Sequence, residues 1–250
     1  MTTRYLEFSK LFQKYWWFTP VTIFIFWRMI LEIIGRIFVD SNLIMPWPRN
    51  PHPPLWARWD SGWYDSIVYY GYHLRSGMMS NVTFFPFYPL LWKMVMTVGR
   101  LPTFVSALVV SNFLSVGGFI IFYRWVMIRW DKLSALRALI ALAVFPTSFF
   151  LISAYSESTL FVLTASTLLF IERNNWKVAA LAAFLASIAR PVGILLWPLL
   201  VWFYFSQVKG NIFKEKIDLF FVSVIPPVGL ILFSLYLWYQ VGDPLAWLHG

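Results

Sequence analysis

Long apolar segments recur along this chain, and they constrain its fold more than any other feature. A helix needs roughly 20 apolar residues to cross a membrane, and candidate segments lie at 16–39, 103–123, 134–152, 157–172, 177–190, 191–206 and 217–240. Charged residues make up only 12% of the 250 residues, about half the share of a soluble domain. We therefore expect an all-α polytopic membrane protein with about seven transmembrane helices, forming one domain over residues 1–250.

The first apolar run carries Arg28, Glu32 and Arg36 and lacks a small-residue cleavage site, so we expect an uncleaved anchor helix rather than a signal peptide. The preceding segment 1–15 is polar and basic and suits a cytoplasmic, amphipathic entry. The three charged residues are four positions apart and therefore share one face of the helix. Ionisable groups within a membrane span normally face the interior of the helix bundle. Two interpretations remain open. The three form an ion-pair ladder that locks helix packing, or Arg36 helps to bind an anionic ligand.

The longest segment between apolar runs is 40–102, which we expect to be a non-cytoplasmic first loop. Its prolines between residues 46 and 54 break any helix there, whereas helical turns are plausible for 61–72 and 87–99. The topology depends on whether the apolar stretch 84–100 crosses the membrane, because every later span inverts with that choice.

Basic residues decide between the two topologies. Nine lie between the later spans (Arg124, Arg129, Lys132, Arg137, Arg173, Lys177, Lys209, Lys214 and Lys216). If 84–100 does not cross, these nine join the basic N-terminus in the cytoplasm, as the positive-inside rule requires. We therefore predict an interfacial or re-entrant helix at 84–100. The loop 40–102, Glu157 and Arg190 then all lie on the non-cytoplasmic side.

Composition excludes several other chemistries. The net charge of +9 is explained by the positive-inside bias and by anionic lipid headgroups, so we expect membrane lipids and no nucleic acid as partners. Cysteine is absent, and the three histidines form no HExxH pattern, which disfavours a zinc hydrolase. The sequence requires no cofactor. A divalent metal is compatible with carboxylates near a phosphate, but no residue pattern demands one. Asn81-Val-Thr83 matches a glycosylation sequon.

Asp60 is the first candidate for catalysis, since it lies among Arg58, Trp59 and Trp63. An aspartate in an aromatic, partly desolvated setting can be tuned as a general base. The alternative is a helix N-cap, because Asp60 precedes a predicted helix. Asp65, five residues later, falls on another helical face, and we expect it at the surface or in a supporting role.

Two further charged residues stand at predicted membrane boundaries. Glu157 follows Ser156, which suits an N-cap with Glu157 in the first helical turn. Arg190 precedes Pro191, which ends or kinks its helix, and this break predicts a cavity wall. Arg190 could clamp a phosphate through its planar fork or pair with Glu157, since a charge at that depth needs a partner.

Several of these residues belong to short motifs that occur in a fixed order. The motifs are Arg58-Trp-Asp-Ser-Gly-Trp-Tyr64, Gly71-Tyr72, Phe84-Phe-Pro-Phe-Tyr-Pro-Leu90, Phe145-Pro-Thr-Ser148, Ala154-Tyr-Ser-Glu157 and Ala189-Arg-Pro-Val-Gly193. In this order they resemble the PIG-V-like mannosyltransferases of the GT-C glycosyltransferase superfamily. The resemblance covers most of the chain.

The resemblance implies an enzyme that transfers a sugar, mannose in the family, from a polyprenyl-phosphate donor to a lipid-linked or glycan acceptor with inversion. Such enzymes carry their catalytic acid in the first external loop, which corresponds to Asp60 here. The resemblance further implies that Arg58 and Arg190 stabilise the phosphate of the donor and that Glu157 orients the acceptor or Arg190. The aromatic residues Trp59, Trp63, Tyr64 and Tyr72 suit sugar stacking.

The resemblance also sets expectations for the membrane in which the protein resides and for the length of the chain. The membrane would be the plasma membrane in a prokaryote and the endoplasmic reticulum in a eukaryote, with a non-cytoplasmic active site. Family members extend well past residue 250, so we expect a truncated or naturally short version, with part of the family's C-terminal fold missing. The rival hypothesis is a non-enzymatic protein that binds or transports polyprenol lipids, in which Asp60 is dispensable. A purely structural assembly partner is a third option.

Overall fold

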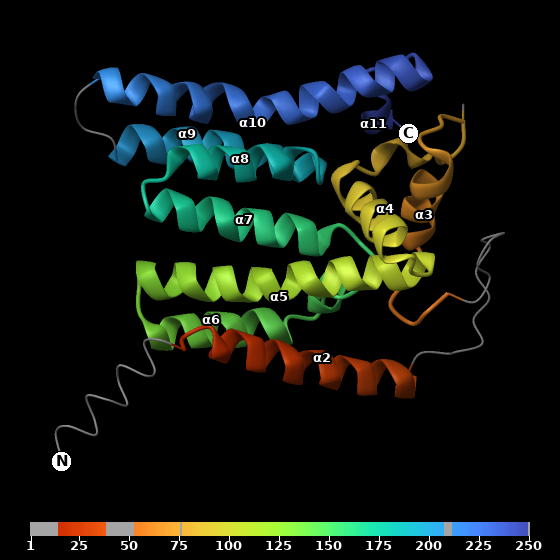
Figure 1. Ribbon diagram of the computed structural model, residues 1–250, viewed down its shortest axis with the longest axis horizontal. Helices are drawn as coiled ribbons and strands as arrows, with labels where there is room; N and C mark the ends of the chain where they lie inside the picture. Colours follow the sequence, from red (N-terminus) through yellow and green to blue (C-terminus); the bar gives the residue numbers. More distant parts are fainter. Residues whose placement is uncertain (1–14, 39–52, 76, 208–211, 250) are drawn as a thin grey trace.

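The computed structural model describes residues 15–38, 53–75, 77–207 and 212–249, with only the backbone described for 212–215. All regular structure in these residues is helical, which confirms the predicted all-α class. The expectations for segment 1–14, for the prolines up to residue 51 and for Lys209 lie outside the described residues. The long helices run roughly parallel to one another (Figure 1). They are α2 (Phe18–Phe38), α5 (Thr103–Arg129), α6 (Lys132–Val144), α7 (Glu157–Glu172), α8 (Trp176–Ser187), α9 (Leu196–Gln207) and α10 (Ile212–Val241).

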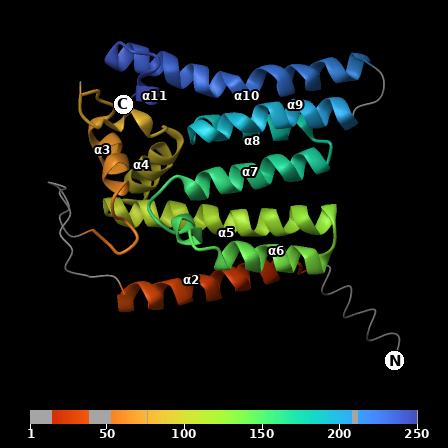
Figure 2. The ribbon, with the colours of Figure 1, turned by 180° about the vertical axis from the view of Figure 1, so that it is seen from behind.

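Further elements, which do not run parallel to these helices, gather at one end of the bundle. The helices α3 (Ser61–Tyr70), α4 (Phe87–Gly99) and α11 (Ala246–His249) lie there across the ends of the long helices, as Figures 1 and 2 show from opposite sides. The 3₁₀ helix η1 (Asn81–Thr83) links α3 to α4 and contacts α11. The predicted helices at 61–72 and 87–99 are thus confirmed as α3 and α4, and α4 does not run alongside the long helices.

The chain reverses direction at each long helix, so alternate connections meet at the same end. The start of α5, the segment before α7 and the break after α8 all lie at the end that carries α3 and α4 (Figure 1). The short connections between α5 and α6 and between α7 and α8 lie at the opposite end. The loop 53–102, Glu157 and Arg190 are therefore brought to one end of the bundle.

Local residues set where these helices begin and end. Asp131 caps α6, because its Oδ1 accepts a hydrogen bond from the backbone N–H of Ser134 at 2.8 Å, and Asn175 caps α8 in the same way. Gly71 ends α3 with a positive φ of 74°, a conformation that glycine adopts readily.

Two predicted helices are shorter than expected because of proline. The segment 134–152 was predicted as one helix, but α6 ends at Val144 and is followed by extended Phe145 and the 3₁₀ helix η2 (Ser148–Leu151). The residue before a proline is disfavoured in α conformation, and Phe145 precedes Pro146. At the second position α8 ends at Ser187, and the 3₁₀ helix η3 (Pro191–Leu195) leads into α9, which confirms the predicted break at Pro191.

The charged residues of α2 form the predicted ion-pair ladder. The Glu32 carboxylate accepts from Arg28 Nη1 at 2.7 Å and from Arg36 Nε at 2.8 Å. Glu32 also accepts from the indole N–H of Trp56 at 2.8 Å, and Arg28 Nε donates to Asn112 of α5 at 3.1 Å. The ladder therefore ties α2 to α5 and to the loop. The expectation of a face turned inwards is wrong for Arg36, whose side chain is 75% exposed.

The bundle buries small residues inside and exposes large apolar ones outside. The buried face of α8 carries alanines at 179, 180, 182, 183 and 186, which lets α7 and α10 pack close to it. Exposed apolar side chains cover α2 and α10, including Phe26, Ile33, Leu235 and Trp238. Among the described helices, Thr103–Arg129 and Lys216–Val241 are long and apolar enough to cross a membrane.

Candidate active site

A small polar pocket lies at the end of the bundle where α3, α7 and η3 meet. Its volume is about 180 Å³. The residues that line it come from four separate segments: Asp60 and Tyr64, Thr83 to Phe85, Tyr155 and Glu157, and Ala189 to Pro191. The predicted site residues Asp60, Tyr64, Glu157 and Arg190 are therefore brought together by the fold.

Hydrogen bonds between distant segments hold this pocket in shape. The hydroxyl groups of Tyr64 and Ser156 are 2.6 Å apart, in a hydrogen bond that joins α3 to the start of α7. Ser61 Oγ donates to the carbonyl of Ala154 at 3.2 Å. The Tyr155 hydroxyl donates to the carbonyl of Arg58 at 3.0 Å. These groups are buried, and buried hydrogen-bonded networks fix a unique geometry. Asp60 and Glu157 are thereby fixed relative to each other.

Arg190 forms an ion pair with Glu157 through Nη1 and Oε1. The backbone of Arg190 is extended at the start of η3, because Pro191 follows it. Gly193 allows η3 to turn back onto α8, since a Cβ at this position would collide with the carbonyl of Ala186. The structural alternative for Arg190, pairing with Glu157, is thus confirmed, and both side chains still line the pocket.

Asp60 precedes α3, but its side chain makes no capping hydrogen bond. The N-cap interpretation is therefore contradicted, and the carboxylate is free to serve the pocket. Asp60 is an exposed residue at the pocket rim. Partial desolvation of its carboxyl raises the pKa of Asp60 above the usual value, against the opposing effect of Arg190. A carboxylate with a raised pKa is a stronger base, as acid–base catalysis needs.

Glu157 lies in the first turn of α7, as predicted. Ser156 occupies the N-cap position, but its hydroxyl bonds to Tyr64 and makes no side-chain cap, so the capping role predicted for Ser156 is wrong. One oxygen of Glu157, Oε2, is buried and has no hydrogen-bond partner among the described residues. Such an atom carries a desolvation cost.

Two predicted site residues line a neighbouring pocket instead. Arg58 and Trp59 border an apolar pocket of about 350 Å³ on the other side of Tyr155. Arg58 is buried, whereas Trp59 is 60% exposed. Trp59 adopts a positive φ of 48°, which is strained for a bulky residue and characteristic of functional sites.

The other two predicted aromatic residues support the pocket from behind. Trp63 stacks on Phe84, with ring centroids 6.1 Å apart and an interplanar angle of 19°. The Tyr72 hydroxyl donates to the carbonyl of Phe84 at 2.7 Å. Phe84 lines the pocket, so Trp63 and Tyr72 act on the pocket through Phe84 and do not line it.

Sequence reasoning missed Tyr155, which lines both the polar pocket and the pocket beside Arg58. It belongs to the motif Ala154-Tyr-Ser-Glu157, in which only the charge of Glu157 drew attention. Burial and the nearby Asp60 raise the pKa of Tyr155 above its usual range, and burial raises the pKa of Tyr64 likewise. Both therefore remain neutral hydroxyl groups.

Two expectations outside the pocket need correction. Asp65 is buried rather than at the surface, and it accepts a hydrogen bond from Thr103 Oγ1 at 2.7 Å, which leaves its supporting role. Asn81 of the sequon is also fully buried. Its amide donates to Ser66 Oγ and to the carbonyl of Gly71, and its oxygen accepts from the N–H of His73. A glycan cannot be attached to this side chain in the folded protein.

Within the described part of the chain, no three His, Asp or Glu side chains gather as a metal site. The pocket itself offers two carboxylates, those of Asp60 and Glu157, of which the second is paired with Arg190. The Asp60 carboxylate can therefore accept a proton, and the Arg190 guanidinium can bind a phosphate.

A second apolar groove adjoins the polar pocket on the opposite side from Arg58. Its volume is about 390 Å³, and it lies between α3, α4, α8 and α10. Three segments line both cavities in succession: Tyr64 leads to Ile67, Phe85 leads to Pro86, and Arg190 follows Ile188. The groove and the pocket are therefore lined by neighbouring residues of three chain segments, and no residue lines both.

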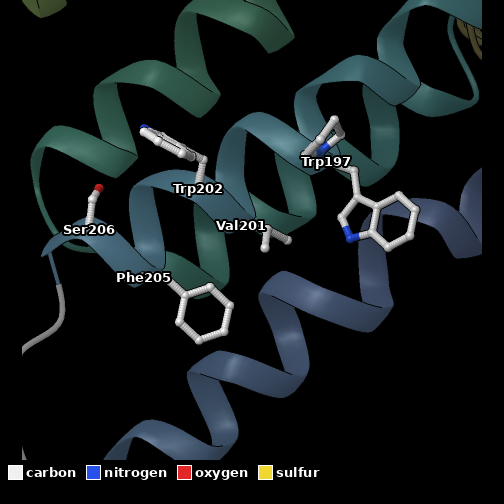
Figure 3. Close-up of a pocket in the computed structure, with 6 residues that line it drawn as sticks. Trp197, Val201, Trp202, Phe205 and Ser206 are labelled. Carbon is white, nitrogen blue, oxygen red and sulfur yellow. The ribbon is translucent and has the colours of Figure 1, made fainter.

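A larger groove of about 600 Å³ follows the surface of α9 (Figure 3). The side chains that line it include Trp197, Val201, Trp202 and Phe205, and all come from α9. None of these residues is charged, and none belongs to the polar pocket. This groove offers apolar contact but no group for chemistry.

Comparison of the chain with protein families, with curated proteins and with solved structures gives no match.

Proposed function

We propose that the protein is a membrane glycosyltransferase that transfers a sugar from a polyprenyl-phosphate donor to an acceptor hydroxyl with inversion. One observation carries this proposal: Asp60, Glu157 and Arg190 meet in a polar pocket, and an apolar groove is lined by residues close to them along the chain. A base and a phosphate-binding cation suit the reacting head of such a donor, and the groove suits its chain. The motif resemblance to PIG-V-like mannosyltransferases makes mannose the first sugar to test.

Membrane insertion is supported by the outer surface of the bundle. Large apolar side chains are exposed along α2, α9 and α10, where a soluble protein would carry charges. Arg129, Lys132, Arg173 and Lys177 lie at the bundle end opposite the pocket. By the positive-inside rule this end is cytoplasmic. The pocket then opens on the non-cytoplasmic side, with α4 at the interface and α2 and α5 to α10 as seven membrane-embedded helices. Of these, α6, α8 and α9 have 12 or 13 residues and are shorter than a full span. The membrane would be the plasma membrane in a prokaryote and the endoplasmic reticulum in a eukaryote.

In the proposed reaction Asp60 acts as the general base. It takes the proton from the acceptor hydroxyl while the hydroxyl oxygen attacks the anomeric carbon of the donor. The bond from this carbon to the phosphate oxygen breaks, and the polyprenyl phosphate leaves with the electron pair. Attack from the face opposite the leaving group inverts the configuration at the anomeric carbon.

Arg190 is the cation for the departing phosphate. Its guanidinium can bind phosphate oxygens through two parallel N–H groups, and stabilising the charge that develops on a leaving group lowers the barrier. Glu157 positions this guanidinium through their ion pair.

The apolar groove explains why the donor would carry a prenyl chain. Its walls include Ile67, Leu90, Leu232 and Phe233, and Lys93 lies among them as a cation. A phosphate held by Arg190 is next to Ile188, where this groove begins. Burial of successive methylene and methyl groups in it adds affinity for the donor.

Transfer assays in proteoliposomes test the proposal. The wild-type protein, supplied with polyprenyl-phosphate donors radiolabelled in mannose or another hexose, should transfer one sugar preferentially to a membrane-lipid extract. Leu232→Trp, which fills the groove, should raise the KM for a long-chain donor. Ile231→Trp is the matched control, since both side chains are about half exposed and only Leu232 lines the groove.

The rival function, lipid binding or transport without transfer, makes a different prediction for the same assay. Prenyl phosphate would bind and respond to Leu232→Trp, but no sugar would reach any acceptor. That result would contradict the transferase and favour the binding protein.

A further inference from the structure

The ion-pair ladder on α2 lies outside the polar pocket, yet it holds the chain segment that leads to Asp60. Glu32 accepts a hydrogen bond from the indole N–H of Trp56 at 2.8 Å. The Arg28 guanidinium lies over the same ring, 5.7 Å from its centre. Gly35 leaves room for the ring, since a Cβ there would come within 2.9 Å of Trp56 Cζ2. The side chain of Trp56 is therefore seated on α2.

The backbone that follows Trp56 is joined to the segment before α7 by hydrogen bonds. The carbonyl of Trp56 accepts from the backbone N–H of Ala154 at 2.7 Å. The carbonyl of Arg58 accepts from the Tyr155 hydroxyl at 3.0 Å. Further along, Ser61 Oγ donates to the carbonyl of Ala154 at 3.2 Å. The candidate base lies between the last two of these contacts, so its position depends on the path of segment 56–61.

Glu32 is a rigid point of attachment for this segment. Its Oε2 accepts from both Arg28 and Trp56, and its Oε1 accepts from Arg36. Arg28 is itself held by Asn112 of α5 at 3.1 Å. A carboxylate that is bonded through both oxygens has a fixed orientation, and charged residues within a membrane span are costly and usually serve a function.

From these contacts, and resting on the proposed function, we propose that Glu32 is a positioning residue for Asp60 and acts through Trp56. A general base must lie within hydrogen-bond reach of the proton that it takes, and a misplacement of about 1 Å can reduce a rate about 100-fold. Glu32 and Trp56 do not line the polar pocket. Their effect on transfer therefore arises from the placement of Asp60.

The variant Trp56→Phe tests this link, because it removes the indole N–H and keeps an aromatic ring at the position. It should lower kcat about 10- to 100-fold. The KM for the polyprenyl-phosphate donor should stay unchanged, since Arg190 belongs to another segment. Trp125→Phe is the matched control. It also replaces a partly buried tryptophan, but at the opposite end of α5, where the ring packs on Trp130, and it should behave as the wild type.

Two variants of Glu32 separate positioning from stability. Glu32→Ala and Glu32→Gln both remove the ion pairs with Arg28 and Arg36, so both should lower the midpoint of thermal unfolding. Only glutamine keeps an oxygen that can accept the hydrogen bond from Trp56. We therefore expect Glu32→Ala to lower kcat as much as Trp56→Phe does, and Glu32→Gln to retain most of the wild-type kcat.

The strictest comparison uses the Asp60→Asn background. If Trp56 acts through Asp60, the double variant Asp60→Asn with Trp56→Phe should transfer sugar no more slowly than Asp60→Asn alone, because no base remains to be misplaced. A tryptophan that only supports the fold would instead reduce the residual transfer further.

Hydrogen exchange gives a readout that does not depend on the reaction. The peptide that contains the Ala154 amide should exchange faster in Trp56→Phe and in Glu32→Ala than in the wild type, because this amide bonds to the Trp56 carbonyl. Exchange in Trp125→Phe should remain at the wild-type rate.

Several outcomes would overturn the proposal. A wild-type kcat in Trp56→Phe, equal losses of kcat in Glu32→Ala and Glu32→Gln, or a further loss in the Asp60→Asn background would each overturn the positioning role while leaving the transferase in place. Unchanged exchange at Ala154 would overturn the link from α2 to the segment before α7. Altered exchange with no transfer by the wild-type protein would overturn the transferase and, with it, the positioning role.

Discussion

The Arg190 guanidinium and the Glu157 carboxylate form an ion pair that joins the break after α8 to the first turn of α7. Both side chains are about one-third exposed, so the pair is neither fully buried nor freely solvated. Both residues line the polar pocket together with Asp60. The position of the candidate phosphate-binding cation therefore depends on an acidic residue 33 positions earlier in the chain.

Glu157→Gln should lower both stability and donor affinity, because it leaves Arg190 without a counter-charge. For a pair that is partly solvated we expect a loss of about 1–2 kcal/mol in the free energy of unfolding, measured as a lower midpoint of thermal unfolding in detergent. Glu172→Gln is the matched control, since Glu172 pairs with Arg129 at 3.5 Å at the other end of the bundle. Equal midpoints in the two variants would contradict this role of the pair.

Gly193→Ala should disturb the active site from outside it. The added methyl group collides with the carbonyl of Ala186, so η3 must shift and take Arg190 with it. We expect a loss of about 1–3 kcal/mol in stability and a higher KM for the donor. Gly117→Ala is the comparison, because its new Cβ would meet no atom closer than 3.8 Å. A Gly193→Ala protein with wild-type donor KM would show that Arg190 is not positioned through η3.

The rate of transfer should fall as the pH is lowered through the pKa of Asp60, because only the ionised carboxylate accepts a proton. Partial burial raises this pKa, so the loss should begin at a higher pH than for a solvated aspartate with a pKa of about 3.9. The pH profile of single-turnover transfer measures this. Donor binding over the same range is the control. A rate that stays constant down to pH about 4 would exclude Asp60 as the base.

The raised pKa of Asp60 also makes the stability of the folded protein depend on pH, and stability falls as the pH rises. A folded-state pKa above the unfolded value means that the folded protein binds the proton more tightly. This contribution is present in full below the unfolded pKa and is lost as the pH rises through the folded one. The ionised Asp60 is therefore a cost to the fold at neutral pH, as expected for a residue retained for chemistry.

Trp59→Gly should separate function from stability. Glycine relieves the positive φ of 48° but enlarges the freedom of the unfolded chain, so the free energy of unfolding should change by less than about 1 kcal/mol. Transfer should nevertheless fall, since Trp59 lines the apolar pocket and directly precedes Asp60, which lines the polar pocket. Trp63→Gly is the contrasting variant. It removes from α3 a ring that stacks on Phe84, so it should clearly lower the midpoint of thermal unfolding. A destabilised Trp59→Gly with normal transfer would contradict both parts.

The parts of the fold set by local patterns could be predicted from the sequence. Long apolar segments located most of the long helices, and Pro191 marked the break after α8. Pro146 also indicates a helix end, but the apolar segment 134–152 leads to the prediction of one continuous helix there, which is wrong. Charge bias placed the loop, Glu157 and Arg190 together, and the structure brings all three to one end of the bundle.

Contacts between distant segments could not be predicted in the same way. The hydrogen bonds from Tyr64 to Ser156 and from Tyr155 to the Arg58 carbonyl span more than 90 residues, and no local pattern encodes them. Arg58 and Trp59 were assigned to the Asp60 site by proximity in sequence. The left-handed turn at Trp59 instead directs them to the neighbouring pocket. That turn is a product of tertiary packing, which sequence spacing does not reveal.

The most direct test of the central claim compares sugar transfer by the wild-type protein and by Asp60→Asn in proteoliposomes with radiolabelled polyprenyl-phosphate-mannose. The Asp60 side chain makes no capping hydrogen bond, so the variant should fold and bind donor as the wild type does. Loss of a general base should reduce transfer about 10²- to 10⁴-fold. Equal transfer by both proteins, with equal donor binding, would contradict the assignment of Asp60 as the catalytic base.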